Sequence, residues 1–551
     1  MNLSRITLAW CVTASLALTA SAALAVEWNT AGRDLKNSRY QSDEKRISTK
    51  TVGSLTLKWA VSTSGDVTAN PAVDTDHIYF PDSAGFLYKV HRATGAVIWK
   101  RTIASYTGIE GDFARATPAL AGRTLILGNQ AGKLATPGGA MVIGVDKVTG
   151  NLLWRTAIDD GSISNPASNA FKQRYSYITH SAVVAAGKAI IGIASNEELI
   201  AGFVPKAWGW TWNFRGSVVA VNVADGAIAW RTYTVPEGYF GGAVWGSTGA
   251  VDIDRRSVYM ATGNNYMVPD FVLTCINGGG SPATCMSPAN HFNSILSLDL
   301  DTGAIKWAAK GLPYDAWNVG CGLNVPGVFT VAPNDNCPSP NGPDWDFAQG
   351  PMLFADTGPD RDNGLVGAGQ KSGMFWTFRA KDGLPVWSSQ VAPGGLTGGL
   401  QWGSATDGQS IFVAASNSGL TGSGTTPGVW TLKDGTTTTA GGWAALDAKT
   451  GAFQWTTKDP LGSRAEAAVS GANGVVFGCN LDQVNGTMYA LDAKTGQVLW
   501  SFNSGSGGSP FVTGVFGACN AGPSIADGMV FWGTGAFQGA PGPKKVFAFG
   551  L

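Results

Sequence analysis

The chain repeats one ten-residue phrase. It reads Leu446-Asp-Ala-Lys-Thr-Gly-Ala-Phe-Gln-Trp455 and returns as Leu491-Asp-Ala-Lys-Thr-Gly-Gln-Val-Leu-Trp500. Each copy joins an apolar strand to an alternating strand through a polar turn in which glycine can take positive φ. Weaker copies, each with Gly four positions before Trp, end at Trp99, Trp154, Trp230, Trp307 and Trp387. The phrase therefore predicts a β-hairpin that occurs seven times.

The spacing of the copies predicts a propeller. Successive phrase glycines lie 45 to 80 residues apart, which is the length of one small antiparallel sheet with variable loops. An eighth copy is divided between the two ends, because Val546 to Leu551 matches the strand that enters the phrase and Leu57-Lys-Trp59 matches the strand that leaves it. Closing the ring removes exposed sheet edges. We therefore expect an all-β fold, an eight-bladed β-propeller with four-stranded antiparallel blades, in which Trp59 and Phe547 share one blade.

The first 25 residues are typical of a secretory signal peptide. They carry Arg5, an apolar run from Ile6 to Ala20, and small residues before a cleavage point after Ala25. The alternative, a membrane anchor, needs about 20 apolar residues in a longer unbroken span. Because the repeat then continues without a Pro/Ser-rich linker, we expect residues 26–551 to form a single propeller domain in the periplasm.

Composition fits this architecture and narrows the function. The chain has 75 Gly, 21 Trp and only 14% charged residues, which is typical of short strands and tight turns. Without Arg5, 37 Lys and Arg face 38 Asp and Glu, a net charge of about −1. Such a balance gives no support for binding to nucleic acid or to an anionic membrane surface.

Six cysteines follow the predicted signal peptide, and an even number in an exported chain indicates disulfides. Sequence alone allows 15 connectivities for six cysteines. Clustering favours Cys275 with Cys285 and Cys321 with Cys337, which leaves Cys479 with Cys519. No C-x-x-C-H or paired C-x-x-C is present, so covalent haem and structural zinc find no support.

The repeated phrase A-x-D-x-x-T-G-x-x-x-W resembles the tryptophan-docking repeat of the pyrroloquinoline quinone (PQQ) alcohol dehydrogenases. The resemblance covers nearly the whole mature chain. It is closest to the polyvinyl-alcohol dehydrogenase branch, judged from Ser195-Asn-Glu-Glu198, Gly369-Gln-Lys-Ser-Gly373 and Ala521 to Met529. These strings lie between docking phrases, where the family places the loops that line its central site.

The resemblance implies four cofactor-binding residues. Trp245, in Gly241-Gly-Ala-Val-Trp-Gly246, matches the tryptophan on which PQQ stacks; the alternative is a tryptophan packed between blades. Arg115 and Thr179 supply donors that suit a tricarboxylated quinone. Lys371 matches the cationic residue beside the reactive carbonyls, where it can stabilise developing negative charge. We expect these side chains to meet in one cavity.

The resemblance also implies calcium, held by Glu197 and Asn264. Both follow apolar strands and offer the hard oxygen ligands that calcium prefers. Glu198 replaces Glu197 if the register is shifted by one residue. Gly320 stands where lanthanide-type relatives carry an extra aspartate, which favours calcium.

The catalytic base is where the chain departs from the family pattern. Relatives carry the base as the last aspartate of a D-x-W-D string, and the string Asp315-Ala-Trp-Asn318 ends in an amide that cannot accept a proton. Asn318 can still orient the alcohol or bind calcium, and Asp315 becomes the candidate base, with Glu110 in reserve. The chain also lacks the adjacent cysteine pair that covers the quinone in many relatives.

The sequence therefore predicts a periplasmic PQQ- and calcium-dependent dehydrogenase that oxidises secondary or polymeric alcohols, such as polyvinyl alcohol, to ketones. Lacking a haem motif, it would pass electrons to a separate soluble cytochrome c. The alternative is a non-enzymatic propeller scaffold of the outer-membrane assembly type, which carries similar phrases but does not need Glu197, Asn264, Trp245 and Lys371 around one cavity.

Overall fold

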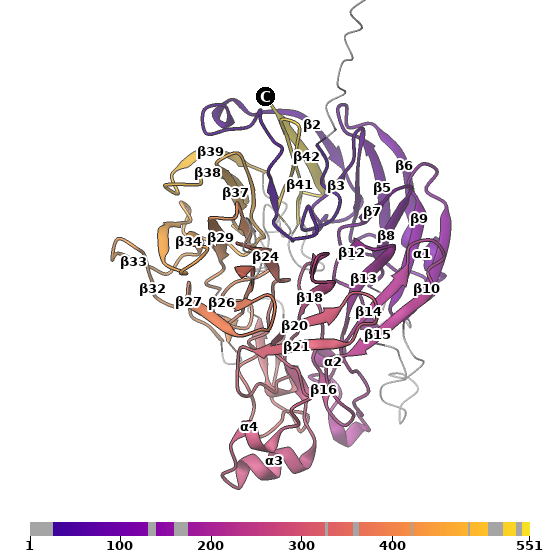
Figure 1. The fold of residues 1–551 in the computed structure, drawn as a ribbon, viewed down its shortest axis with the longest axis vertical. Coiled ribbons are helices and arrows are strands. Elements are labelled where there is room, and N and C mark those ends of the chain that lie inside the picture. The colour runs from indigo at the N-terminus through magenta and orange to yellow at the C-terminus, as the bar shows by residue number, and fades with distance from the viewer. Residues whose placement is uncertain are drawn as a thin grey trace, which may run out of the picture.

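The computed structural model describes residues 26–130, 139–158, 175–325, 329–355, 363–418, 420–421, 424–482, 485–504, 522–535 and 543–551. Eight four-stranded antiparallel blades are arranged around a central axis (Figure 1), so the predicted eight-bladed propeller is confirmed. The predicted signal peptide lies outside the described residues. In the parts of the chain that the structure describes, no helix is long and apolar enough to cross a membrane.

Within each blade the strands are ordered from the innermost, next to the axis, to the outermost, and the first three pair in sequence order. Blades 1 to 4 contain β3 (Ala72–Val73), β4 (His77–Pro81), β5 (Phe86–His91) and β6 (Val97–Thr102); β7 (Ala119–Ala121), β8 (Thr124–Gly128), β9 (Met141–Asp146) and β10 (Leu152–Ala157); β12 (Val183–Ala185), β13 (Lys188–Ser195), β14 (Ser217–Asn222) and β15 (Ile228–Tyr233); and β17 (Ala250–Asp252), β18 (Ser257–Ala261), β20 (Ser294–Asp299) and β21 (Ile305–Lys310). Blades 5 to 8 contain β24 (Met352–Phe354), β25 (Leu365–Gly369), β26 (Met374–Arg379) and β27 (Pro385–Gln390); β28 (Ala405–Thr406), β29 (Ser410–Ala415), β34 (Gly442–Asp447) and β35 (Phe453–Lys458); β36 (Ser470–Ala472), β37 (Val475–Cys479), β38 (Thr487–Asp492) and β39 (Val498–Asn503); and β40 (Ser524–Ala526), β41 (Met529–Gly533), β42 (Lys545–Gly550) and β2 (Thr56–Ser62).

Blade 8 closes the ring as predicted. Its outer strand β2 comes from the start of the domain and pairs antiparallel with β42 from the end, with Ala60 opposite Phe547 and Trp59 opposite Ala548. Because β42 also pairs with β41, the last strand of the chain lies inside the sheet. The two ends of the chain therefore hold one another in place.

The repeated phrase also supplies a contact between neighbouring blades. The tryptophan that ends one phrase packs against the phrase glycine of the next blade, and its indole N–H donates to a backbone carbonyl there, as Trp455 does to Ala493 at 2.9 Å. At Gly496 a Cβ atom would lie 2.5 Å from the Trp455 ring, and φ is +72°, so only glycine fits both the turn and the contact. The same pairing joins Trp59 to Gly95, Trp99 to Gly150, Trp154 to Gly226, Trp230 to Gly303, Trp307 to Gly383 and Trp387 to Gly451.

The interface between blades 7 and 8 is built differently, because blade 8 has no phrase glycine. Trp500 contacts Phe549 edge-on with ring centroids 5.2 Å apart, and Phe502 lies 4.6 Å from the same ring. Trp532 stacks on Phe549 at 4.9 Å. An aromatic cluster thus replaces the tryptophan–glycine contact at the point where the ring closes.

Residues 28–41, which we call the strap, visit all eight blades in order. The strap makes hydrogen bonds of 2.6 to 3.2 Å with a residue in or next to the innermost strand of each blade. The pairs are Trp28 with Val73, Asn29 with Leu120, Thr30 with Ala182, Leu35 with Val251, Lys36 with Leu353, Ser38 with Thr406, Arg39 with Gly471, and Gln41 with Ile525.

The two ends of the strap meet. Gln41 donates through Nε2 to the carbonyl of Glu27 at 2.8 Å, and Arg33 donates to Oε1 of Gln41 at 2.8 Å. The strap residues Tyr40–Gln41 form β1, which pairs parallel with β36 of blade 7. The strap is therefore a closed ring across the central channel, and it joins blades that are hundreds of residues apart in sequence.

Insertions between the blade strands carry the remaining elements. They are the helices α1 (Ile103–Thr107), α2 (Glu197–Ile200), α3 (Asp270–Asn277) and α4 (Pro282–Cys285); the 3-10 turns η1 (Val52–Ser54), η2 (Lys206–Trp208) and η3 (Val319–Cys321); and the strands β11 (Ser176–Tyr177), β16 (Phe240–Gly241), β19 (Asn265–Met267), β22 (Leu323–Val325), β23 (Phe329–Val331), β30 (Leu420–Thr421), β31 (Gly424–Thr425), β32 (Trp430–Thr431) and β33 (Thr437–Thr438). Figure 1 shows α3 and α4 projecting away from the ring at the bottom of the view.

Two disulfides cross-link residues within these insertions, and both were predicted. Cys275–Cys285 joins α3 to α4, and Cys321–Cys337 closes the loop after η3. Cys479 is also disulfide-bonded. Its predicted partner Cys519 lies outside the described residues.

Candidate active site

A buried lysine is the centre of the site. Lys371 lies in the turn between β25 and β26 and is 7% exposed. Its Nζ lies 2.8 Å from Oδ1 of Asp344 and 3.2 Å from Oδ2 of Asp346. Burial by itself lowers the pKa of a lysine, but these two carboxylates raise the pKa of Lys371 above its usual value. The ammonium group is therefore charged at neutral pH.

Asp346 connects the lysine to two other predicted site residues. Its Oδ2 accepts a hydrogen bond from Nε1 of Trp245 at 2.8 Å, and its Oδ1 accepts one from the backbone N–H of Asn264 at 2.6 Å. The Lys371 ammonium lies 5.3 Å from the centroid of the Trp245 ring. Three of the predicted residues, Trp245, Asn264 and Lys371, are thus brought together by a carboxylate that the sequence interpretation did not include.

Adjacent glutamates at the start of α2 have separate roles. The Glu197 carboxylate accepts hydrogen bonds from the backbone N–H groups of Asn213 and Phe214 at 3.0 to 3.3 Å, so it holds the following loop. Glu198 lies beside Asn264 instead, and its Oε1 has no hydrogen-bond partner. Burial, and after it the Asp346 carboxylate, raises the pKa of Glu198 to about 8. Of the two glutamates, Glu198, the one-residue alternative, is the one that lies beside Asn264.

Around Lys371, carboxyl side chains outnumber basic side chains. Glu198, Asp315, Asp344 and Asp346 interact with one another, and Lys371 is the cation among them. Burial raises the pKa of Asp344 well above its usual range, although Lys371 opposes the rise. The buried amide oxygen Oδ1 of Asn264 also lacks a partner. Two unpaired oxygens in an acidic, buried group suit a bound cation.

The donor set fits calcium in part. Among the described residues, no three His, Cys, Asp or Glu side chains converge on one point that a metal could occupy. A cation would therefore be held by a mixed set, the carboxylate of Glu198 and the amide oxygen of Asn264, with Asp346 close to both. Calcium takes six to eight oxygen ligands, so a bound small molecule and water would have to complete the shell.

A cavity rich in donors lies beside Trp245. Arg115 stacks over the Trp402 ring with its guanidinium carbon 4.6 Å from the centroid, and Trp402 meets Trp245 edge-on at 5.6 Å. Thr179 donates to the carbonyl of Trp245 at 3.1 Å. The lining residues are Ala31, Arg39, Thr68, Ala69, Asn70, Arg115, Ala116, Thr117, Thr179, Ser181, Ser247 and Trp402.

The lining of this cavity, whose volume is about 30 Å³, is cationic. Its lining contains two guanidinium groups and no carboxylate. Two buried polar atoms of the lining, Oγ of Ser247 and Nε1 of Trp402, lack partners. Such donors bind carboxylates by charge-assisted hydrogen bonds, and the indole rings offer flat apolar surfaces. The predicted residues Arg115 and Thr179 therefore line the cavity, and Trp245 lies next to it through its contacts with Trp402 and Thr179.

Two of the residues predicted to act in proton transfer, Asp315 and Asn318, are held by hydrogen bonds to the protein. Both oxygens of Asp315 accept hydrogen bonds from the protein, from the backbone N–H groups of Asp344 and Trp345 and from the Asn293 side chain. Asn318 uses its amide to hold backbone, since Nδ2 donates to the carbonyls of Tyr266 and Asn336 and Oδ1 caps η3 at the N–H of Gly320.

Asp315 and Asn318 are therefore both held by the surrounding protein, burial raises the pKa of Asp315 to about 6, and the reserve candidate Glu110 is exposed.

Four residues of the site were missed by the sequence interpretation. Asp344 and Asp346 belong to Asp344-Trp345-Asp346, a second aspartate–tryptophan–aspartate string 28 residues after the one that was chosen, and this motif could have found them. Tyr177, whose pKa burial and the Glu198 carboxylate raise to about 12, lies among Glu198, Arg115 and Lys371. Neither Tyr177 nor Trp402 carried a sequence signal.

The comparisons with known proteins agree with this geometry. A family model, PQQ_2, described as outer membrane protein assembly factor BamB, matches residues 45–309 and 377–536. The chain is 27% identical over 529 residues to polyvinylalcohol dehydrogenase from Sphingopyxis sp. (strain 113P3) and 28% identical over 533 residues to polyvinylalcohol dehydrogenase from Pseudomonas sp., covering 92% of this chain and 72% of the relative in each case. The predicted resemblance is confirmed.

Solved structures share the fold. Quinohemoprotein alcohol dehydrogenase from Comamonas testosteroni superposes with a TM-score of 0.65 at 18% identity, covering 96% of this chain and 81% of the other. A europium-containing methanol dehydrogenase gives a TM-score of 0.61 at 16% identity, covering 95% of this chain and 98% of the other.

Proposed function

Because the chain belongs to the PQQ_2 family, and because its channel holds an acidic group of side chains beside a donor-rich cavity, we propose that it is a PQQ- and calcium-dependent alcohol dehydrogenase. The observation that carries the proposal is the meeting of Lys371, Asp346, Trp245 and Asn264. A buried ammonium, an indole face and unpaired carboxylate and amide oxygens are the groups that a quinone and a divalent cation need.

Each predicted role is assigned to a residue by position. Arg115 and Thr179 would bind the carboxylates of PQQ, and Trp245 would offer a flat surface for its rings. Glu198 and Asn264 would ligate calcium.

Oxidation of an alcohol to a carbonyl removes two electrons and two protons. When bound, PQQ supplies the electron acceptor and calcium the Lewis acid that polarises it. Asp346, the last residue of Asp344-Trp345-Asp346, accepts the hydroxyl proton as general base. Lys371 donates toward the oxygen on which negative charge develops. Asp344 holds the Lys371 ammonium in place through its 2.8 Å contact.

Steady-state assays test the proposal. The purified chain, loaded with PQQ and calcium, should oxidise alcohols with an artificial dye as acceptor. Replacing the base in Asp346→Asn should lower kcat by about 10² to 10⁴ while PQQ still binds. Asp344→Asn should have a smaller effect, since it removes one partner of Lys371. Full turnover in Asp346→Asn with loss of activity in Asp344→Asn would move the base to Asp344.

The second candidate is a propeller scaffold, which the family description favours. A scaffold has no use for a buried lysine between two aspartates in the channel, because burying charges costs free energy that apolar packing does not. No oxidation of any alcohol, from short primary alcohols to polyvinyl alcohol, by protein shown to contain PQQ and calcium would favour the scaffold.

The polyvinylalcohol dehydrogenases cover most of this chain, so a secondary or polymeric alcohol is the substrate class we propose. The product is a ketone. We place the enzyme in the periplasm, exported by residues 1–25, with a soluble cytochrome c as the electron acceptor. Covalent haem absorbance in the purified chain would exclude a separate acceptor, because it would show a redox centre on the same polypeptide.

A further inference from the structure

The buried side chain of Asp315 fixes the backbone segment that carries the carboxylates of Asp344 and Asp346. Asp315 is 1% exposed and lies between β21 and η3. Its Oδ2 accepts from the N–H of Trp345 at 2.7 Å, and its Oδ1 accepts from the N–H of Asp344 at 3.1 Å. Nδ2 of Asn293 donates to Oδ2 at 2.8 Å. One carboxylate thus satisfies two successive peptide N–H groups and one side-chain amide.

The backbone that Asp315 holds is strained. Asp344 has φ of +58°, a left-handed conformation that non-glycine residues adopt at a cost in free energy. Such a conformation persists where the surroundings over-determine it. Gly342 packs so closely that a Cβ there would lie 2.2 Å from Oδ1 of Asp315, and its N–H donates to the carbonyl of Ala316 at 2.7 Å. Three backbone N–H groups of residues 342–345, those of Gly342, Asp344 and Trp345, therefore donate hydrogen bonds to residues 315–316.

The backbone of Asp315 is also hydrogen-bonded to Asn265, the neighbour of the proposed calcium ligand Asn264. The N–H of Asn265 donates to the carbonyl of Asp315 at 3.1 Å, and the N–H of Trp317 donates to the carbonyl of Asn265 at 2.9 Å. Asn265 follows Asn264, whose N–H donates to Asp346. Asp315 therefore connects the backbone of the proposed calcium ligand to the backbone of the proposed base.

We propose that Asp315 is a positioning residue that sets the distance between the Asp344/Asp346 carboxylates and Lys371, and that it takes no proton from the alcohol. The inference rests on the proposed function. In Asp315→Asn, one of the two acceptor oxygens becomes an amide N–H₂ that faces a peptide N–H, so the segment shifts. Misplacement of a reacting group by about 1 Å costs on the order of 10²-fold in rate.

The test uses a graded series on the PQQ- and calcium-loaded enzyme. We expect kcat to fall about tenfold in Asp315→Asn and further, to about a hundredfold, in Asp315→Ala, which removes both acceptors. Asn293→Gly should lower kcat by a few-fold; glycine is chosen because Asn293 has φ of +41°. KM for the alcohol should stay close to the wild type in all three variants, because a shifted reacting group lowers kcat without removing a contact to the substrate.

A matched control is available in Asp459. This buried aspartate also accepts from two backbone N–H groups, those of Leu461 and Ser463, and from the side-chain amide of Asn480. It lies after β35, outside the site. Asp459→Asn should lower the thermal midpoint about as much as Asp315→Asn and leave kcat within twofold of the wild type.

Two results would overturn the inference. One is loss of all activity in Asp315→Asn together with wild-type turnover in both Asn293→Gly and Asp346→Asn, which would make Asp315 the base. The other is wild-type turnover in both Asp315 variants. If the wild type oxidises no alcohol, the proposed function fails, and crystal structures decide the positioning role. Residues 344–346 displaced from Lys371 in Asp315→Asn would support it, and an unchanged segment would refute it.

Discussion

At the residue scale, Glu197 and Glu198 are adjacent, but the Glu197 carboxylate binds backbone N–H groups and Glu198 is the proposed calcium ligand. We predict that Glu198→Gln lowers calcium affinity by tenfold or more, on the order expected when a site loses one carboxylate. Glu197→Gln should leave calcium affinity near the wild type and lower the free energy of unfolding by about 1 to 3 kcal/mol, because the loop N–H groups lose a charged acceptor.

Calorimetric titration of the metal-free protein and chemical denaturation measure the two effects. Weaker calcium binding in Glu197→Gln than in Glu198→Gln would return the ligand role to Glu197.

His180 predicts a pH dependence of stability. It is 1% exposed, and burial lowers its pKa to about 3. A histidine whose folded pKa is depressed contributes stability that is complete above the unfolded value of about 6.5 and is lost as the pH falls toward the folded value. Between pH 7 and pH 5 this histidine should cost about 2 kcal/mol of unfolding free energy.

His180→Gln should lose about 2 kcal/mol less than the wild type over the same interval, measured by urea denaturation at both pH values. Parallel losses in the two proteins would show that His180 protonates without penalty in the fold.

Sequence reasoning at this scale named some of the residues that meet in the structure and did not name others. Asn264 and Lys371 each come shortly after an apolar strand, β18 and β25, and Trp245 joins them through Asp346. The base was sought in Asp315-Ala-Trp-Asn318, although Asp344-Trp345-Asp346 is the string that contacts Lys371. Both strings lie in loops after β21, and their paths depend on contacts with Asn265 and Asn293 that periodicity does not encode.

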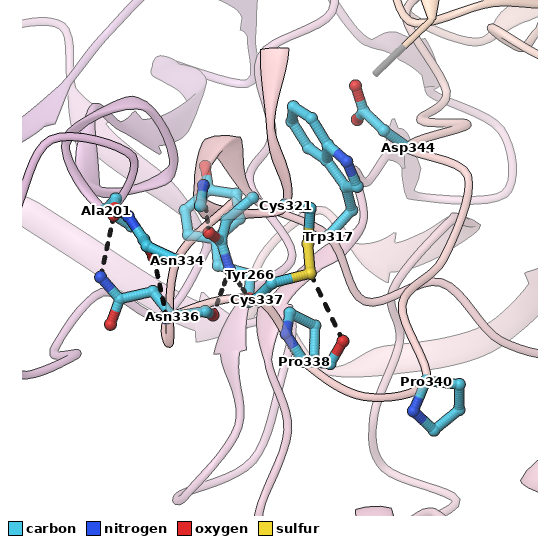
Figure 2. Close-up of a disulfide and its surroundings, with 12 residues drawn as sticks. Ala201, Tyr266, Trp317, Cys321, Asn334, Asn336, Cys337, Pro338, Pro340 and Asp344 are labelled. Carbon is cyan, nitrogen blue, oxygen red and sulfur yellow. Dashed lines mark hydrogen bonds between the residues drawn. A yellow bond between two sulfur atoms is a disulfide. The ribbon is translucent and has the colours of Figure 1, made fainter. Parts of the chain in front are cut away.

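At the scale of elements, the Cys321–Cys337 disulfide supports α2 through its loop. Asn334 and Asn336 of this loop donate from their side chains to the carbonyl of Ala201 at 3.0 and 2.8 Å (Figure 2). Asn336 also donates to the carbonyl of Val204 at 2.7 Å. Since Glu198 lies in α2, the loop holds the helix that carries a proposed calcium ligand.

Replacing both cysteines of this pair by serine should therefore weaken calcium binding as well as stability. The closed loop predicts a loss of about 3 kcal/mol, and we expect calcium affinity to fall severalfold. The matched control is the Cys275–Cys285 pair, which joins α3 to α4 in the projecting lobe. Its double serine variant should lose comparable stability and keep calcium affinity, and equal losses of affinity in both variants would show that the effect is not transmitted through α2.

The blade hairpins were predictable because one phrase specifies both the turn and the contact with the next blade. Gly496 illustrates this, since its positive φ and its contact with Trp455 both exclude a side chain. The insertions were not predictable in the same way. β22, β23 and the loop around Asn334 follow no repeat, and they depend on a disulfide and on side-chain amides that contact backbone far away in sequence.

At the scale of the whole molecule, the sequence predicted the ring through the divided eighth copy, and β2 pairs with β42 accordingly. It did not predict the strap. Residues 28–41 carry no periodic pattern, since eight of these residues each bind a different blade and the partners range from Val73 to Ile525. A segment whose environment changes at every position leaves no hydrophobic period to detect.

The strap predicts a cooperative contribution to stability and to cofactor binding. It makes hydrogen bonds to every blade, and bonds of this kind contribute about 1 kcal/mol each. A variant that begins at Ser42 should therefore lose about 5 kcal/mol or more of unfolding free energy, measured by denaturation. Because Ala31 and Arg39 line the cavity beside Arg115, the same variant should also bind PQQ more weakly, measured by quenching of tryptophan fluorescence.

The control for this truncation deletes residues 433–436, the exposed turn of the hairpin of β32 and β33, and keeps the buried Trp430. That deletion should leave both the denaturation midpoint and PQQ affinity close to the wild type. The strap joins blades that otherwise contact only their neighbours, so its loss should lower the stability of all blades together and keep a single unfolding transition. Two results would contradict a role of the strap in stabilising the whole ring. One is an unchanged denaturation midpoint in the variant that begins at Ser42, and the other is early unfolding confined to blades 7 and 8 beside β1.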